Sequence, residues 1–170
     1  LAWPLRRFIV WMILINRPKE SAHAYEKIWT KDGSPLVVTS KHVQAALQKR
    51  VSVPVELAMR YQSPSIEFAV KNLADKGVND LLLITLFPHY AMSSYETAVV
   101  RVQKVVAKLA PQMKVTVQPP YYSAPEYIEA LVASASDFLK HGYDHLLFSF
   151  HGIPERHLIK ADTTGCHCLK

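Results

Sequence analysis

His151 is the residue whose type and position most directly suggest chemistry, because it follows a nearly continuous apolar run at residues 146–150. Such a run is typical of a buried parallel strand, and a strand of this kind would carry the imidazole to the edge of a sheet. A neutral imidazole nitrogen binds divalent metals, and the same ring accepts a proton near neutral pH. The alternative is a structural histidine that closes the strand by hydrogen bonding to the next helix. The residues alone leave both interpretations open.

Polar and aromatic side chains also follow the other strands that the sequence predicts. They occupy residues 60–63, 88–94 and 119–123. In open parallel sheets, ligands bind beyond the carboxyl ends of the strands, so these segments are expected to share one edge with residues 151–154. His89, in the second segment, is a further candidate. It could pass a metal ion inward, or it could only pack against the helix predicted to start near Ser94.

The segments that must position these side chains alternate between short apolar runs and longer stretches of helical period. Strands are predicted at residues 53–61, 80–87, 114–118 and 145–150. Helices are predicted at residues 41–50, 63–77, 94–111 and 125–142. At the second helix, Ser63 is the expected N-cap and Pro64 the first helical residue. The order predicts an α/β fold with a parallel four-stranded sheet flanked by helices, in one Rossmann-like domain.

Composition limits the possible classes of protein. With 170 residues, 49% of them hydrophobic, the chain suits a single globular domain. The net charge of +6 comes from basic residues scattered among acidic ones, which argues against nucleic acid and suits a dianionic substrate or an anionic membrane surface. The apolar run at residues 8–15 is short of the roughly 20 residues that span a membrane. Cys166 and Cys168 are too close for an unstrained disulfide, so a reducing compartment, the cytoplasm, is expected.

Residues 149–156, with the sequence SFHGIPER, resemble the histidine motif of ferrochelatases, in which a strand ends in Ser-x-His-Gly/Ser-Ile/Leu-Pro. Other segments that look like parts of this family follow in the same order, at residues 17–25, 33–36, 59–61, 87–90 and 121–126. The resemblance covers nearly the whole chain, and several ordered matches are more specific than any single motif. It implies a metal chelatase of the lyase type, which inserts ferrous iron into protoporphyrin IX to form haem.

The resemblance also implies a role for individual residues. His151 corresponds to the family histidine at the porphyrin face, which either ligates the incoming iron or takes up pyrrole protons. The positions expected to hold or line the porphyrin are Arg17, Tyr25, Ser34, Arg60, Tyr61 and Tyr122. A guanidinium fork and hydroxyl groups would meet the propionate oxygens. If the family resemblance is disregarded, Tyr25 could be an ordinary aromatic residue on a helix face, and Arg17 could simply be exposed to solvent.

The two ends of the chain carry further expectations from the family. Residues 1–30 are expected to form an apolar lip and a porphyrin-contacting segment ahead of an α/β chelatase domain at residues 31–170. Residues 1–15 of the lip could contact lipid at the inner face of the membrane, or could form a helix packed on its own domain. Some ferrochelatases hold a [2Fe–2S] cluster with four cysteines, so Cys166 and Cys168 could contribute to one if further cysteines follow residue 170.

The sequence departs from the family pattern in two respects, which limit what it predicts. Ferrochelatases have an apolar strand before the segments seen here, and a second similar domain with an acidic residue opposite the histidine. These residues therefore look like part of a longer chain, and this part alone is expected to be inactive if the acidic residue of the second domain is required. The alternatives left open are a coproporphyrin ferrochelatase, a related cobalt chelatase, and a porphyrin- or haem-binding protein without catalysis.

Overall fold

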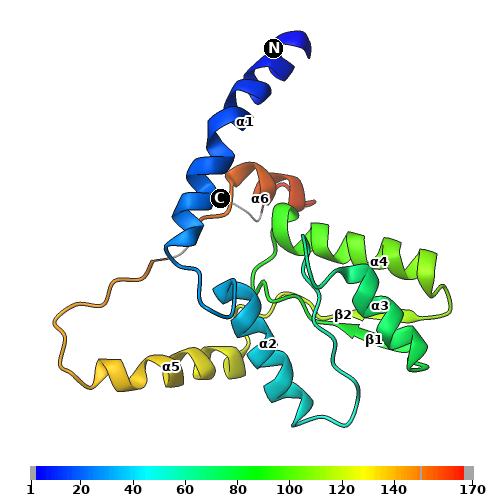
Figure 1. Ribbon diagram of the computed structural model, residues 1–170. Coiled ribbons are helices and arrows are strands. Elements are labelled where there is room, and N and C mark those ends of the chain that lie inside the picture. The colour runs from blue at the N-terminus through cyan, green and yellow to red at the C-terminus, as the bar shows by residue number, and fades with distance from the viewer. Residues whose placement is uncertain (1–2, 150, 167–170) are drawn as a thin grey trace. The chain divides into compact units, whose positions relative to one another are not determined.

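The computed structural model describes residues 3–149 and 151–166, and the chain divides into two compact units, Leu1–Leu57 and Ala58–Lys170. Figure 1 labels the helices and strands of both units. We describe each unit by itself. The expected division into a lip at residues 1–30 and a chelatase domain at residues 31–170 stays a prediction.

The first unit contains two helices, α1 (Trp3–Glu26) and α2 (Pro35–Gln48). The turn between them is closed by backbone hydrogen bonds in both directions between Thr30 and Gly33, and Gly33 adopts a φ of 108° that disfavours a side chain. Proline suits the first position of α2, because its missing N–H would have no helical partner there. For this reason α2 begins before residue 41, where the sequence predicts a helix to start.

The segment predicted as a strand at residues 53–61 does not form one. Its backbone groups are bonded instead by glutamine side chains of α2. Gln48 accepts from the Val55 N–H at 2.8 Å and donates to the Val53 carbonyl at 3.0 Å, while Gln44 donates to the Val55 carbonyl at 2.8 Å. Further along, only an isolated bridge between Met59 and Ser65 is present. Glutamine side chains therefore form the hydrogen bonds to Val53 and Val55 that a neighbouring strand would otherwise form.

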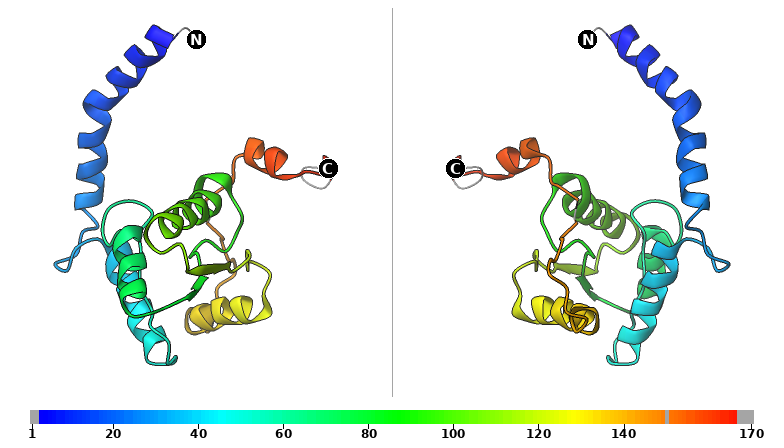
Figure 2. Two further views of the ribbon diagram at one scale, coloured as in Figure 1. Left: turned by 90° about the vertical axis from the view of Figure 1, so that its right-hand side faces the viewer. Right: turned by 90° about the vertical axis from the view of Figure 1, so that its left-hand side faces the viewer.

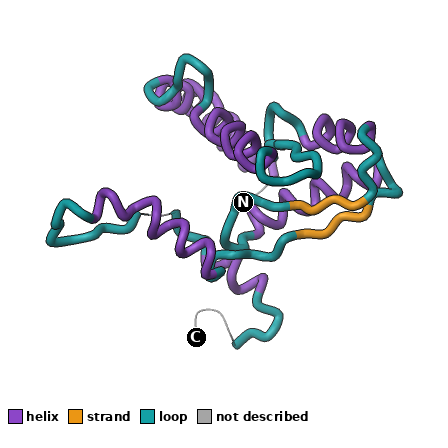
Figure 3. Tube along the Cα trace, turned by 90° about the horizontal axis from the view of Figure 1, so that it is seen from below, coloured by secondary structure: helices purple, strands orange, loops and turns teal. Residues whose placement is uncertain are grey.

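The second unit contains a parallel sheet of two strands, β1 (Asp80–Leu83) and β2 (Lys114–Val117). Figure 3 shows them side by side. Asp80 is in register with Lys114, and Leu83 with Val117. These strands confirm the predictions at residues 80–87 and 114–118, with shorter bounds. The prediction of a four-stranded sheet is wrong for the described residues, which contain two strands in this sheet.

The second missing strand is the one predicted at residues 145–150, immediately before His151. Phe150 lies outside the described residues, and residues 145–149 pair with no described strand. The side chains of Leu146, Leu147 and Phe148 are 59%, 91% and 75% exposed. Figure 2 shows this segment as a loop that links α5 (Pro125–Leu139) to α6 (Glu155–Ala161). A strand needs a neighbour for its hydrogen bonds, and here none of the described strands is beside it.

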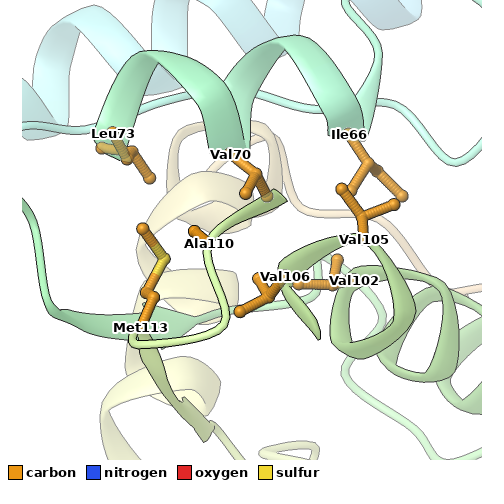
Figure 4. Close-up of a cluster of buried hydrophobic side chains, with 8 residues drawn as sticks. All are labelled: Ile66, Val70, Leu73, Val102, Val105, Val106, Ala110 and Met113. Carbon is orange, nitrogen blue, oxygen red and sulfur yellow. The ribbon is translucent and has the colours of Figure 1, made fainter. Parts of the chain in front are cut away.

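The hydrophobic core of this unit lies between α3 (Ile66–Asp75), α4 (Thr97–Leu109) and one face of the sheet. Figure 4 shows how the side chains of α3 point toward those of α4 and of the turn that follows it. The buried cluster consists of Ile66, Val70, Leu73, Val102, Val105, Val106, Ala110 and Met113. Leu81, Leu83 and Val115 pack against this cluster from the strands. Leu82 points to the other face and is 56% exposed, so the cluster fixes the two strands from one side.

The starts of α3 and α4 differ from the predicted helix starts. Ser65, and not Ser63, caps α3, because its hydroxyl accepts a hydrogen bond of 3.1 Å from the Phe68 N–H. Pro64 precedes this cap and follows a cis peptide bond. A short π-helix, η1 (Met92–Glu96), leads into α4, so the single helix predicted from residue 94 is a π-helix that starts at Met92 followed by an α-helix. The predicted helix at residues 125–142 is confirmed by α5.

Candidate functional site

The loops that follow β1 and β2 are hydrogen-bonded to each other. The carbonyl oxygen of Pro88, after β1, accepts from the backbone N–H groups of Tyr121 and Tyr122, after β2, at 3.0 and 3.1 Å. The Tyr121 hydroxyl also donates to the carbonyl oxygen of Thr85 at 3.1 Å. Parallel strands run in the same direction, so loops after their carboxyl ends meet at one edge, as the sequence predicted for these segments.

This arrangement brings together two residues singled out from the sequence, His89 and Tyr122. Their rings are stacked, with centroids 5.0 Å apart and planes inclined by 10°. Both side chains are exposed, Tyr122 to 50%. An imidazole and a phenol ring therefore stand together at the solvent-facing edge beyond the strands.

A second group of tyrosines fixes the segment after His89. Tyr90 donates a hydrogen bond of 2.8 Å to Glu96 in η1, and Tyr95 donates one of 2.8 Å to the carbonyl oxygen of Gln118 after β2. Burial, followed by the hydrogen bond to Glu96, raises the pKa of Tyr90. Burial also raises the pKa of Tyr121, with a smaller contribution from Tyr127. Both hydroxyl groups therefore stay protonated and remain donors at neutral pH.

Arg60 and Tyr61 contact each other in the segment that precedes α3. The guanidinium carbon of Arg60 lies 4.6 Å from the centroid of the Tyr61 ring, a cation–π contact. Arg60 Nε also donates to the carbonyl oxygen of Thr97 at 3.1 Å, which ties the segment to the start of α4. Tyr61 is 71% exposed.

Two open hollows adjoin Arg60. One, of about 440 Å³, is lined by Arg60, Met92, Glu96, Thr97, Val100, Arg101 and Lys104. The other, of about 370 Å³, is lined by Met59, Arg60, Tyr61, Gln62, Ser65, Ile66, Glu67 and Arg101. Arg101 forms an ion pair with Glu67 at the second hollow. Three cationic side chains, Arg60, Arg101 and Lys104, therefore surround the first hollow, and His151 lines neither of them.

His151 is exposed and lies in the loop before α6. Its Nδ1 is 2.7 Å from the carbonyl oxygen of Gly152. A carbonyl oxygen only accepts, so Nδ1 must carry the proton in this hydrogen bond, and in the neutral ring Nε2 keeps its lone pair. That nitrogen is chemically able to bind a metal or to take up a proton. The expected strand that would place it at the sheet edge is not formed, so its position relative to His89 stays a prediction.

The other predicted porphyrin-binding residues belong to the first unit. Arg17 lies in α1, and its side chain is outside the described part of the structure. Tyr25 is in the last turn of α1 and is 60% exposed. Ser34 is the N-cap residue of α2, but its hydroxyl forms no capping hydrogen bond. The hydroxyl groups of Tyr25 and Ser34 are chemically suited to donate to an anionic ligand.

The cysteines by themselves do not fit an iron–sulfur cluster. Cys166 is exposed and its thiol is free, while Cys168 lies outside the described residues. A [2Fe–2S] cluster of the kind expected needs four cysteine ligands, and these 170 residues contain two. Within residues 3–149 and 151–166, no group of three or more His, Cys, Asp or Glu side chains is arranged to hold a metal ion.

The sequence analysis missed the part played by Tyr121, Pro88 and Thr85. The pair of adjacent tyrosines after β2 was the available signal, since one ring can face inward while the other remains exposed. Thr85 is 6% exposed, and its hydroxyl has no hydrogen-bond partner among the described residues. It accepts from Tyr121 through its backbone oxygen instead. The side chain that joins the loops, that of Tyr121, is thus not one of those predicted to bind a ligand, although the backbone of Tyr122 also bonds to Pro88.

Comparisons with known proteins agree with the family resemblance that the sequence motifs indicate. The family model described as Ferrochelatase matches residues 1–170. Proteins named ferrochelatase from Stutzerimonas stutzeri (strain A1501) and Ectopseudomonas mendocina (strain ymp) are each 52% identical over 171 residues, which cover 100% of this chain and 50% of the relative. A ferrochelatase from Opitutus terrae is 49% identical over 170 residues, covering 98% of this chain and 49% of the relative.

The chain belongs to the ferrochelatase family. The motif segments that suggested the resemblance therefore led to the correct family. The chain spans about half the length of the curated relatives it matches. Among the described residues, no helix combines the length and apolar character needed to cross a bilayer.

Proposed function

We propose that this protein inserts ferrous iron into protoporphyrin IX, forming haem and releasing two pyrrole protons. The observation that carries the proposal is the match to the ferrochelatase family over all 170 residues. Iron is the substrate in this reaction. Its insertion requires a group that accepts protons from the macrocycle and a ligand that receives the ion as it loses water.

In this proposal His151 supplies the essential nitrogen. Its Nδ1–H group donates to the Gly152 carbonyl, which leaves Nε2 as the atom that accepts a pyrrole proton or ligates the iron. The side chain is exposed, so a large flat substrate can reach it. His89 is proposed to assist the entry of the metal.

The porphyrin is a flat apolar disc with an anionic edge, and its binding site needs aromatic walls and a few cationic or hydroxyl donors. We assign these roles to the six positions predicted from the family, Arg17, Tyr25, Ser34, Arg60, Tyr61 and Tyr122. Support comes from the exposed rings of Tyr25, Tyr61 and Tyr122, and from the Arg60 guanidinium held beside Tyr61. We further propose that residues 1–15, which include the first half of α1, contact the inner face of the membrane, where an apolar porphyrin could enter.

The proposal is tested with the purified protein, expressed from its complete coding sequence and assayed without oxygen. Ferrous iron and protoporphyrin IX are mixed, and the loss of porphyrin fluorescence measures insertion. Replacing His151 by Ala should lower kcat about 10²- to 10⁴-fold, the range for removal of an acid–base group. His145→Ala, an exposed histidine earlier in the same loop, is the matched control.

The same assay separates the alternative functions. A higher kcat/KM with coproporphyrin than with protoporphyrin would assign the protein to the coproporphyrin type. Insertion of cobaltous but not ferrous ions would indicate a cobalt chelatase. Tight porphyrin binding with no insertion of either ion would indicate a carrier, and the proposal would then be wrong.

A further inference from the structure

We propose that Tyr122 is a positioning residue, which holds the His89 imidazole by ring stacking so that His89 can pass the metal ion toward the porphyrin. The inference rests on the function proposed above and deepens it. It changes the role of Tyr122 from a residue that only lines the porphyrin site to one that acts through His89.

The geometry of the two rings is the first argument. Ring planes inclined by only 10° with centroids 5.0 Å apart describe an offset stack, one of the arrangements that aromatic rings prefer. Such a stack fixes the direction of the imidazole plane. The lone pair of a neutral imidazole nitrogen lies in that plane, so stacking on the ring face leaves the nitrogen available to a metal.

The hydrogen bonding of His89 is the second argument. A histidine that binds a metal is usually oriented by a hydrogen bond from its other ring nitrogen. Within the described part of the chain, no protein group forms a hydrogen bond with either ring nitrogen of His89, and its side chain is exposed. The Tyr122 ring is therefore the group that supplies the orientation.

The third argument is that the two backbones are fixed to each other beside the stack. The Tyr122 N–H donates to the carbonyl oxygen of Pro88, the residue immediately before His89, at 3.1 Å. Tyr121 donates to the same oxygen at 3.0 Å and, through its hydroxyl, to Thr85. The stacked rings thus project from two loops that cannot separate without breaking these bonds.

Another histidine–tyrosine contact in the chain serves as a matched control. His141 and Tyr143 lie after α5, with ring centroids 6.3 Å apart and planes inclined by 66°. Both are exposed. This edge-on contact is outside the loops that follow the strands, so Tyr143→Leu removes the same kind of ring without affecting His89.

The kinetic test uses the purified protein expressed from its complete coding sequence, with ferrous iron and porphyrin varied separately. Tyr122→Leu should raise the KM for ferrous iron about two- to tenfold, the effect of losing one aromatic pair. Tyr122→Phe, which keeps the ring, should restore most of that loss. In a His89→Ala background, Tyr122→Leu should raise this KM no further. A rise confined to the porphyrin KM, or an equal rise in the His89→Ala background, would overturn the inference.

A second measurement does not depend on turnover. The His89 ring resonances of histidine-labelled protein are followed by NMR during titration with Zn²⁺. Zinc should perturb them in the wild type, with an apparent Kd about two- to tenfold higher in Tyr122→Leu and unchanged in Tyr143→Leu. If the wild type inserts no iron, the proposed function fails, but this titration still decides the role of Tyr122. Equal zinc affinities in the wild type and Tyr122→Leu would refute it.

Discussion

The Tyr121 hydroxyl donates a hydrogen bond of 3.1 Å to the carbonyl oxygen of Thr85, which joins the loop after β2 to the loop after β1. The Thr85 side chain is buried, while Tyr122, next to Tyr121, is exposed. The side chains of the adjacent tyrosines therefore have different roles: the Tyr121 hydroxyl fastens the loops, and the exposed Tyr122 ring lies at the ligand edge. The relative positions of His89 and Tyr122 depend on this connection.

Replacing Tyr121 by Phe should lower the free energy of unfolding by about 0.5–1.5 kcal/mol, because one hydrogen bond to a part-buried carbonyl is lost. Urea denaturation of the purified protein measures this change. Tyr143→Phe alters an exposed tyrosine and should change stability by less than about 0.5 kcal/mol. Equal effects of the two substitutions would show that the hydrogen bond to Thr85 does not contribute.

The effect of Tyr121→Phe on stability should depend on pH. Burial raises the pKa of Tyr121 above its ordinary value of 10.0, so the unfolded chain releases this proton at lower pH than the folded protein. The stabilisation from the neutral hydroxyl is therefore complete below about pH 10 and is lost as pH rises through the folded pKa. The difference in stability between the wild type and Tyr121→Phe should narrow above that pH. Parallel curves of stability against pH would contradict this.

Leu73→Ala should destabilise the second unit by about 2–5 kcal/mol, because it leaves a cavity in the core between α3 and α4. Leu73 is 5% exposed, whereas Leu82, on the open face of β1, is 56% exposed. Leu82→Ala removes the same atoms and should cost less than about 1 kcal/mol, since most of that side chain is already in water. Urea denaturation compares the two. Similar losses would mean that the open face is covered in solution.

The strands illustrate how far the sequence could predict the fold. Apolar runs correctly indicated β1 and β2, since periodicity reports which side chains prefer burial. It does not report which backbone groups will find a neighbouring strand. Val53 and Val55 have the residue type of a strand, yet Gln44 and Gln48 satisfy their backbone, and no pattern of hydrophobicity reveals such bonds.

The candidate site, like the fold, was predicted only in part. The rule that loops after parallel strands share one edge brought His89 and Tyr122 together correctly, although they are far apart in the sequence. Their stacking could not be predicted, because it depends on backbone bonds to Pro88 that leave no periodic signal. The placement of His151 at this edge was inferred from a strand that the described residues do not form, so it stays a prediction.

Arg60→Lys should weaken porphyrin binding even though it keeps the charge. Arg60 is held by Tyr61 and by the Thr97 carbonyl, and lysine lacks the planar fork that donates to two carboxylate oxygens at once. Loss of a charge-assisted hydrogen bond corresponds to an increase in porphyrin Kd of about 10-fold or more. Quenching of porphyrin fluorescence measures it. Lys108→Ala removes an exposed cation in the last turn of α4 and serves as the control; an equal effect there would mean that net charge alone attracts the porphyrin.

The proposed contact of α1 with lipid predicts that two glutamates on one side of this helix will weaken membrane binding. Leu5 and Met12 are 49% and 50% exposed, and a separation of seven residues places them two turns apart on the same side. Leu5→Glu combined with Met12→Glu should lower co-sedimentation with phosphatidylglycerol-containing vesicles about tenfold or more, because buried apolar area is lost and like charges are brought near an anionic surface. The control is Ser21→Glu combined with Ala24→Glu, which adds the same charge at exposed positions near the other end of α1. This pair should lower vesicle binding less than the pair at Leu5 and Met12. If both pairs reduced binding equally, the attraction would be electrostatic only. If the wild type did not co-sediment at all, α1 would not be the lipid contact.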